Sequence, residues 1–198
     1  MKSEQDKKYR TALMKYKTAK HNFDKALSQY NLLKGEYKIG DYYSVSGIKI
    51  DIPFVPSSDN KVKVMVEISG GLKGKKCADL GCGDGKVVLA MLQQSADAYG
   101  FELEPKLIRR ARKNLQKSGY SEHRIIPNSF MTADLSSFNF FTVYGISSMM
   151  EKLETKLLNE ANDGTLIASN TFLFPHLKEI KRSQNVHLYL IEKEKEKE

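Results

Sequence analysis

The sequence predicts an α/β domain in which a mostly parallel sheet is covered by helices on both faces. Two observations favour this class. From residue 76 onward, short apolar runs typical of strands alternate with longer segments whose apolar residues recur every three or four positions. Such alternation produces parallel strands that are joined by covering helices. The first strand is also followed directly by the glycine-rich turn "GCGDGK" (81–86), at the edge where such sheets bind ligands.

Residues 1–40 precede this domain and are expected to form a long amphipathic helix. Residues 5–34 contain no proline or glycine, and their apolar residues recur at helical spacing along one stripe. The segment is basic, with ten Lys/Arg and four Asp/Glu in residues 1–40. Its apolar stripe needs a cover, which can be the main domain, a second copy of the chain in a homo-oligomer, or another partner.

Residues 41–60 are expected to form an extended linker that covers the bound ligand. Pro53 and Pro56 disfavour a helix here. The segment "PFVPSS" (53–58) is interpreted as the part that closes over the ligand, with a rigid connection as the alternative reading.

The main domain is expected over residues 61–192 and is followed by a charged tail, 193–198, with the composition of a disordered segment. Serine at position 57 or 58 can cap the first short helix. The predicted strands are 76–81, 97–103, 123–129, 138–145, 164–174 and 185–193, and the predicted helices are 59–69, 85–95, 104–119 and 147–162.

The composition excludes several classes of protein. Two cysteines, Cys77 and Cys82, are too few for a disulfide framework or a zinc cluster, and no metal site is expected. No apolar run approaches the roughly 18–20 residues that span a bilayer. The first ten residues lack the apolar core of a signal peptide. We therefore expect a cytoplasmic protein without a transmembrane segment.

The glycine turn and the acidic residue after the second strand predict an adenosine-containing ligand. Gly81 and Gly83 permit a tight turn that brings backbone close to a ligand. The third glycine, Gly85, comes one residue too early for the dinucleotide fingerprint. Glu102 ends the second strand, where a carboxylate accepts hydrogen bonds from two ribose hydroxyls. These features alone fit NAD and other adenosine ligands.

Two longer phrases narrow the choice of ligand. "DLGCGDG" (79–85) and "GFELEPKLIRRARKN" (100–114) resemble the first two motifs of class I S-adenosylmethionine-dependent methyltransferases, which have a Rossmann-like, seven-stranded sheet. The resemblance implies S-adenosylmethionine as the cofactor, with its methionine end near Asp79 and its ribose on Glu102. The cofactor-binding residues that it implies are Asp79, Gly81, Cys82, Gly83, Gly85, Glu102 and Leu103, together with Asn128, Ser129 and Phe130 around the adenine.

A narrower resemblance concerns the methyl acceptor. "PFVPSSDNKVKVMVEIS" (53–69), the segment 134–172 and "NVHLYLIEK" (185–193) look like the archaeal protein-lysine methyltransferases, whose eukaryotic relatives methylate lysines of mitochondrial inner-membrane proteins. The resemblance covers roughly residues 52–192 and implies a protein substrate that presents a lysine. The family typically has a His-Glu pair after the fifth strand, whereas this sequence has Asn170–Thr171.

The acceptor pocket is expected at the ends of the fourth and fifth strands. Tyr144 is the predicted wall or hydrogen-bond acceptor of the pocket, with core packing as its alternative role, and Asn170 and Thr171 face it as the other predicted catalytic residues. A lysine amine must lose its proton before it is methylated, and an apolar, aromatic pocket favours that loss. Beyond this, the protein must align the amine with the methyl group, and no general base is predicted.

Two other functions stay open. One is an RNA (rRNA or tRNA) methyltransferase that uses the basic N-terminal helix as an RNA clamp, although the sequence has no RRM, KH or OB signature. The other is an inactive cofactor-binding interaction module with the helix as an oligomerisation arm. Cys77 and Cys82 are not placed to attack a base, and both are predicted to be small packing residues.

Overall fold

The computed structural model of this 198-residue chain describes residues 43–45, 48–50, 54–145 and 147–193. All described helices and strands belong to one compact unit, formed by residues 41–52 and 56–198. The predicted helix over 5–34 lies outside the described residues. Within the predicted linker, β1 (Tyr43–Val45) and β2 (Ile48–Ile50) pair as a two-stranded antiparallel sheet.

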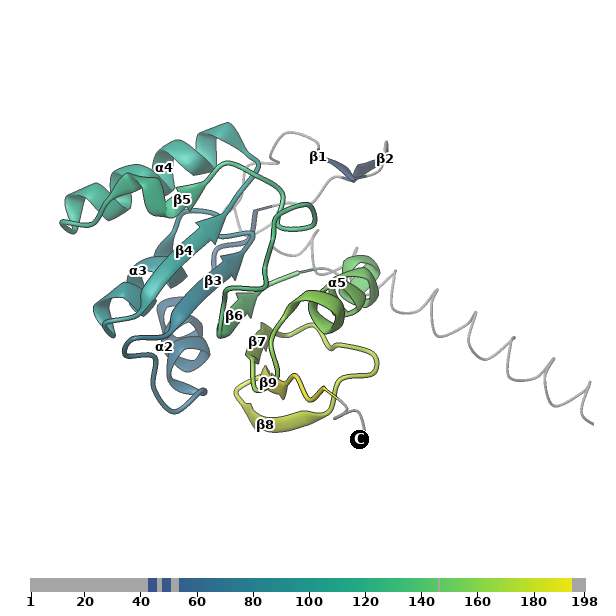
Figure 1. Cartoon of the computed structure of the whole chain (residues 1–198). Helices are drawn as coiled ribbons and strands as arrows, with labels where there is room; N and C mark the ends of the chain where they lie inside the picture. The colour runs from purple at the N-terminus through teal and green to yellow at the C-terminus, as the bar shows by residue number, and fades with distance from the viewer. Residues whose placement is uncertain (1–42, 46–47, 51–53, 146, 194–198) are drawn as a thin grey trace, which may run out of the picture. The chain divides into compact units, whose positions relative to one another are not determined.

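A seven-stranded sheet forms the centre of the unit and confirms the predicted fold class (Figure 1). Its spatial order is β5-β4-β3-β6-β7-β9-β8. The strands from β5 to β7 are parallel, and β9 is antiparallel to both of its neighbours. The bounds are β3 (Lys76–Leu80), β4 (Asp97–Phe101), β5 (Ile125–Ile126), β6 (Phe140–Val143), β7 (Leu166–Asn170), β8 (Glu179–Ser183) and β9 (Val186–Leu190).

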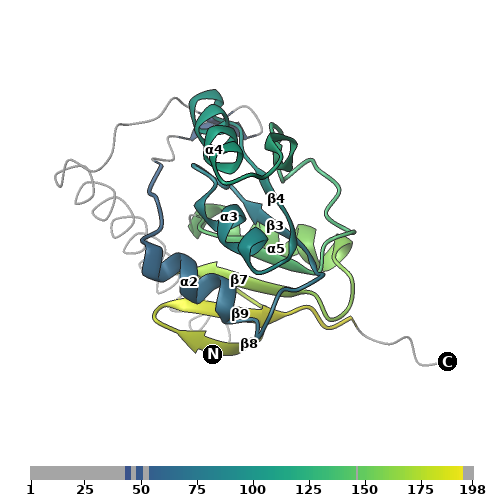
Figure 2. The same cartoon turned by 90° about the vertical axis from the view of Figure 1, so that its left-hand side faces the viewer.

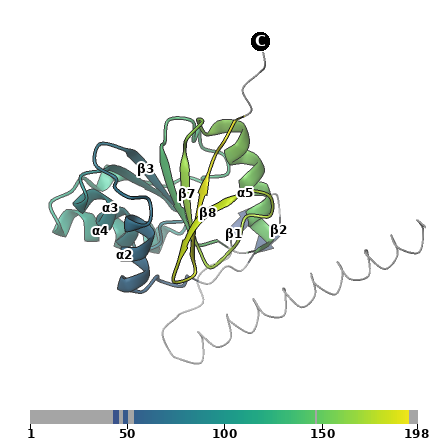
Figure 3. The same cartoon turned by 90° about the horizontal axis from the view of Figure 1, so that it is seen from below.

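Helices cover both faces of the sheet, as predicted. On one face lie α2 (Asp59–Glu67), α3 (Lys86–Gln93) and α4 (Pro105–Lys117), and on the other lies α5 (Ser147–Glu160) (Figures 2 and 3). Successive residues of a strand point to opposite faces. Cys77, Phe140 and Ala168 therefore join the cluster under α2–α4, whereas Leu80 and Val143 join the cluster under α5.

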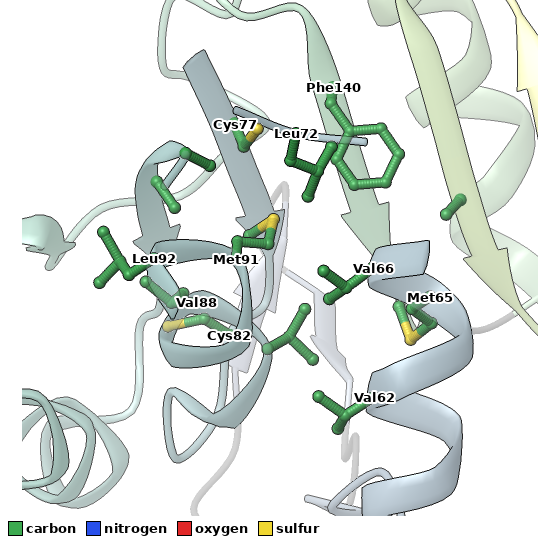
Figure 4. Packing of buried hydrophobic residues seen from close by; sticks show 14 of the residues in the cluster. Val62, Met65, Val66, Leu72, Cys77, Cys82, Val88, Met91, Leu92 and Phe140 are labelled. Atoms are coloured by element: carbon green, nitrogen blue, oxygen red, sulfur yellow. The ribbon is translucent and has the colours of Figure 1, made fainter. Parts of the chain in front are cut away.

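Helix α2, which begins at the carboxyl edge of the sheet, is held in place by its packing against α3 and the sheet. Val62 and Val66 point from α2 toward α3, with Met91 on the facing side of α3 and Phe140 of β6 nearer to Val66 than to Val62 (Figure 4). Burying each such side chain contributes about 1.5–3 kcal/mol. The N-terminus of α2 is capped by the hydroxyl of Ser58, which accepts a hydrogen bond from the backbone N–H of Lys61 (3.4 Å).

Three strands of the seven-stranded sheet differ from the prediction. The strand β8 was not predicted, because it is an edge strand whose exposed Lys181 and Arg182 hide its pattern. The fifth strand ends at Asn170 instead of residue 174, because the next residue, Thr171, has a φ of 70°. The third strand is reduced to Ile125–Ile126 because residues 122–124 form a 3₁₀ turn.

No helix in the described part of the chain is long and apolar enough to span a bilayer. The described ranges also contain no group of three or more His, Cys, Asp or Glu residues placed to hold a metal ion.

Candidate functional site

The glycine turn lies at the carboxyl edge of the sheet, between β3 and α3, and its backbone is bound to the end of β4. Gly81 and Cys82 both donate their backbone N–H to the carbonyl oxygen of Phe101, at 3.1 and 2.9 Å. Gly83 donates its N–H to Oε2 of Glu102 at 2.9 Å. The turn and the acidic residue that were recognised separately in the sequence therefore form one connected structure.

The structure explains why the third glycine of the turn, Gly85, comes one residue earlier than in the dinucleotide fingerprint. This residue has a φ of 80°, which favours glycine, and it forms the N-cap of α3. A Cβ added here would lie 3.1 Å from the Cβ of Ala111 and 3.3 Å from Cδ1 of Leu115 in α4. Gly85 therefore allows α3 and α4 to approach each other closely at the start of α3.

The side chain of Cys82 points away from the loop into the core. A Cβ on Gly100 would lie only 2.6 Å from the Cys82 sulfur, so the sulfur occupies the space that this glycine leaves. Burial raises the pKa of the Cys82 thiol well above its usual value and that of Cys77 to about 12. Both cysteines are confirmed as packing residues, and the role of Cys82 at the cofactor stays a prediction.

Glu102 is held by three backbone N–H groups. Its Oε1 accepts from Leu103 at 2.7 Å and from Glu104 at 2.9 Å, and its Oε2 accepts from Gly83 at 2.9 Å. A carboxylate has about four acceptor positions, so it can accept further hydrogen bonds from a ligand. Leu103, next to it, is 41% exposed and offers an apolar surface beside the carboxylate.

Asp79 is the most perturbed acid of the site. It is buried, and its Oδ1 accepts a hydrogen bond from the hydroxyl of Thr142 at 2.7 Å. The pKa of Asp79 is raised to about 7, mainly by burial; the Thr142 hydrogen bond opposes this rise, and the negative charges of Glu102 and Asp84 add to it. Among the described residues no cation offsets this charge, and a ligand ammonium group would supply one.

Together these groups fit an adenosine ligand with a positively charged end. Glu102 suits two ribose hydroxyls, Asp79 suits an ammonium group, and the glycine turn lets a ligand approach the backbone between them. All three lie at the ends of the adjacent strands β3 and β4.

The residues predicted around the adenine form a turn after β5. Ile126 accepts the backbone N–H of Glu102 at 3.2 Å, so the turn begins beside that residue. Asn128 accepts the N–H of Ser129 with its Oδ1 at 2.8 Å, which leaves the amide N–H₂ of this exposed side chain to donate outward. Phe130 is half-buried against the cluster under α5, as its core alternative would require.

The predicted acceptor residues lie at the ends of β6 and β7. Asn170 is buried, accepts the hydroxyl hydrogen of Thr171 at 3.1 Å and donates to the hydroxyl of Ser57 at 3.4 Å. Tyr144 lies against Phe172, with ring centroids 5.9 Å apart at an interplanar angle of 34°. Phe172 was not predicted as a site residue, because the apolar pattern placed it inside a longer strand.

The N-terminus of α2 is tied to three other elements along the same edge. Ser57 meets Asn170 of β7, Asp59 forms an ion pair with Lys86 of α3 at 3.1 Å, and Asn60 donates to Gln184 in the β8–β9 turn at 2.5 Å. These ties place the end of the "PFVPSS" segment at the candidate site. Its closure over a ligand stays a prediction, and its first residue, Pro53, lies outside the described residues.

Comparisons with known proteins agree with this geometry. The model of the ANTKMT methyltransferase domain matches residues 79–181. The adenine nucleotide translocase lysine N-methyltransferase of Mus musculus is 31% identical over 133 residues, which cover 65% of this chain and 56% of that protein. A protein-lysine N-methyltransferase of Saccharolobus islandicus is 30% identical over 124 residues, covering 61% of this chain and 77% of that protein. The chain thus spans less than two thirds of the mouse relative.

A solved structure supports the same fold and ligand. An RNA methyltransferase from Salinibacter ruber in complex with S-adenosyl-L-homocysteine superimposes with a TM-score of 0.67 at 25% sequence identity. The similarity covers 73% of this chain and 98% of that one. The adenosine ligand in that structure agrees with the ligand class that Asp79 and Glu102 fit here.

Proposed function

The chain belongs to the ANTKMT methyltransferase domain family, and from this premise we propose that it transfers methyl groups to lysine side chains of a protein. The cofactor is S-adenosylmethionine, in line with the family and with the S-adenosyl-L-homocysteine of the Salinibacter ruber structure. The observation that carries the proposal is the extent of the family match, residues 79–181, which includes both the glycine turn and the predicted acceptor residues. Two relatives matched by this chain are named as lysine N-methyltransferases that act on proteins.

In this proposal Asp79 pairs with the cofactor's ammonium group and Glu102 accepts hydrogen bonds from its ribose. Leu103 packs beside the ribose, and the free amide N–H₂ of Asn128 donates to the adenine edge, with Ser129 and Phe130 next to it. Support comes from the raised pKa of Asp79 and from the three N–H groups that fix Glu102. When bound, S-adenosylmethionine supplies an electrophilic methyl group.

The acceptor lysine is proposed to enter beside the Tyr144–Phe172 ring pair. Apolar ring surfaces around an amine disfavour its charged form and lower its pKa, which increases the fraction of amine that can react. Thr171 donates a hydrogen bond to Asn170, and Asn170 donates one to Ser57, just before α2. In this proposal the two residues form the opposite side of the pocket. The remaining task is alignment of the amine, which contributes strongly to rate when it is held in place.

Methyl transfer from radiolabelled S-adenosylmethionine into a cell extract, separated into protein and RNA, tests the proposal. We expect label in protein that acid hydrolysis releases as methyl-lysine, and no label with Asp79→Ala. A second candidate function is RNA methylation, which the name of the Salinibacter ruber structure favours. Label that is confined to RNA would replace the first proposal with the second.

We also propose a cytoplasmic location. Cys77 and Cys82 are free thiols in the core, and free thiols are the usual state in a reducing compartment. A homo-oligomer formed through residues 5–34 stays a prediction, because that segment lies outside the described residues.

A further inference from the structure

One helix carries the excess positive charge of the described domain. The segment Pro105–Lys117, α4, contains six Lys/Arg and no Asp/Glu. The other residues of 54–145 and 147–193 contain thirteen Lys/Arg and fifteen Asp/Glu. The domain without α4 would therefore be slightly acidic.

These cations form a defined face of α4. The basic face consists of the five exposed cations Lys106, Arg109, Arg110, Lys113 and Lys117. Lys106, Arg110, Lys113 and Lys117 follow one another at steps of four and three residues, so they form one row about 16 Å long. The opposite side of the helix is buried in the core, which fixes the basic face toward solvent.

Apart from Lys117, which lies in the last turn where a cation is favourable, these cations do not stabilise the helix. The positive end of the helix dipole repels cations in the first turns, where the one acidic group of α4 is its N-cap, Glu104, whose carboxylate accepts the backbone N–H of Lys106 at 2.9 Å. Like charges four residues apart also repel each other. Arg110 has a partner, Asp84, at 3.8 Å, whereas Arg109, Lys113 and Lys117 form no ion pair with any described residue. An anion from outside the domain would remove this repulsion.

We propose that the basic face binds an acidic segment of the protein substrate, so that the enzyme selects lysines that lie near a run of Asp or Glu. The inference rests on the proposed function, because it assigns the acidic segment to the substrate. In an extended segment, alternate side chains point the same way about 6.6 Å apart. The cations of the row are about 4.5–6 Å apart along the helix axis, so alternate carboxylates can meet successive cations.

The place of α4 in the fold agrees with this role. The helix starts directly after Glu102, Leu103 and Glu104, at the end of β4, and runs back along the sheet (Figure 1). A chain that is bound along α4 therefore reaches the edge where the candidate site lies. A membrane is a poorer partner, because the apolar side of α4 is already buried in the core. Single-stranded RNA is also poorer, because α4 has no aromatic residue on which bases could stack.

The test uses the full chain and two designed fluorescent peptides of about twenty residues. Each contains one lysine, and one peptide has Glu at alternate positions on both sides of it where the other has Gln. Binding is measured by fluorescence anisotropy in saturating S-adenosyl-L-homocysteine, and methyl transfer is measured separately. The variant Arg109→Gln/Lys113→Gln/Lys117→Gln removes three cations of the basic face. The control Lys63→Gln/Lys73→Gln/Lys152→Gln removes three other exposed cations.

We expect the wild type and the control variant to bind the Glu peptide about tenfold more tightly than the Gln peptide, a preference that three exposed ion pairs can produce. The α4 variant should lose this preference while its affinity for S-adenosyl-L-homocysteine is unchanged. Raising the salt concentration should weaken the preference in the wild type.

Two results would overturn the inference: equal affinity of the wild type for both peptides, or equal loss in the two triple variants. A short RNA that binds through the basic face and displaces no Glu peptide would assign the face to RNA instead. Binding of the Glu peptide through α4, combined with no methyl-lysine in any protein of a cell extract, would count against the proposed function and not against the binding surface.

Discussion

The hydroxyl of Thr142 in β6 donates a hydrogen bond to the carboxylate of Asp79 in β3, and both residues are buried. The two strands are parallel and pair these residues directly, so their side chains lie on the same face of the sheet. The hydrogen bond favours the ionised carboxylate and lowers its pKa, whereas burial raises it, and the balance is a pKa of about 7. Thr142 therefore increases the fraction of Asp79 that is ionised at neutral pH.

The variant Thr142→Val should shift the pH dependence of cofactor binding. In the wild type, affinity for S-adenosyl-L-homocysteine should rise as the pH passes through about 7, because the ionised carboxylate attracts the ligand's ammonium group. Valine removes the donor, so the pKa of Asp79 should rise and the midpoint should move to higher pH. A hydrogen bond to a charged group contributes about 1.5–3 kcal/mol, so affinity at pH 7 should fall about tenfold or more. Calorimetric titrations between pH 5.5 and 9 measure this.

The control for this experiment is Asp79→Asn, which has no carboxylate to titrate and should bind weakly with a flat pH profile. An unchanged midpoint in Thr142→Val would show that the hydrogen bond does not control the ionisation of Asp79.

The variant Glu102→Gln should weaken cofactor binding without unfolding the domain. One carboxylate oxygen becomes an amide nitrogen. This nitrogen cannot accept a hydrogen bond from the N–H groups of Gly83, Leu103 or Glu104, which donate to the carboxylate in the wild type. Loss of charge-assisted hydrogen bonds of this kind should raise the dissociation constant for S-adenosyl-L-homocysteine about 10- to 100-fold. Glu67→Gln, at an exposed position of α2, is the control and should bind as the wild type does. Equal affinities in the two variants would remove Glu102 from the binding site.

Glu154 of α5 should be required for the loop between β7 and β8. Its buried carboxylate accepts the backbone N–H groups of His176 at 2.8 Å and Leu177 at 2.6 Å, and it lies 2.8 Å from Nδ1 of His176. Glu154→Ala leaves both N–H groups without their acceptor and should lower the free energy of unfolding by about 3 kcal/mol. His176→Ala removes only the imidazole, which is 73% exposed, and should lower the free energy of unfolding by less than about 1 kcal/mol.

Urea unfolding of the two variants decides this point. Because Phe172 lies in the same loop, Glu154→Ala should also raise KM for the protein substrate more than it changes affinity for S-adenosyl-L-homocysteine. A loss of stability in His176→Ala equal to that in Glu154→Ala would contradict the assignment.

The variant Gly100→Ala should destabilise the domain through the core beneath the glycine turn. The new methyl group would lie 2.6 Å from the sulfur of Cys82 and 2.7 Å from Cγ2 of Val88. Overpacking of this kind costs about 1–3 kcal/mol. Gly145→Ala is the matched control, because its methyl group would meet the flexible ends of Met149 and Met150 at 2.9 and 3.0 Å. Thermal unfolding should show the larger decrease in Tm for Gly100→Ala.

The sequence predicts the parts of the fold that depend on local pattern. Alternating apolar runs and helical periodicities indicated the five parallel strands and the helices on both faces, and glycine spacing indicated the turn bound to Glu102. It could not predict links between distant residues. Thr142 and Asp79 are 63 positions apart, and only the register of two parallel strands brings them together.

The predicted acceptor pocket also contains features that the local sequence pattern could not predict. A single backbone angle, φ of 70° at Thr171, ends β7 four residues earlier than its apolar pattern suggests. That angle releases Phe172 from the strand to meet Tyr144. The contact of Glu154 with the following loop depends on how α5 packs, which no local pattern encodes.

The position of β9 between β7 and β8 has a consequence for synthesis of the protein. A nascent chain that has emerged only as far as Asn185 contains β7 and β8, but each still lacks the neighbour that β9 provides. Unpaired strand edges are sites of aggregation, so the chain is vulnerable during this interval of translation. A premature stop codon just before Val186 would therefore be expected to yield an insoluble product, even though every residue of the proposed site would already have been made.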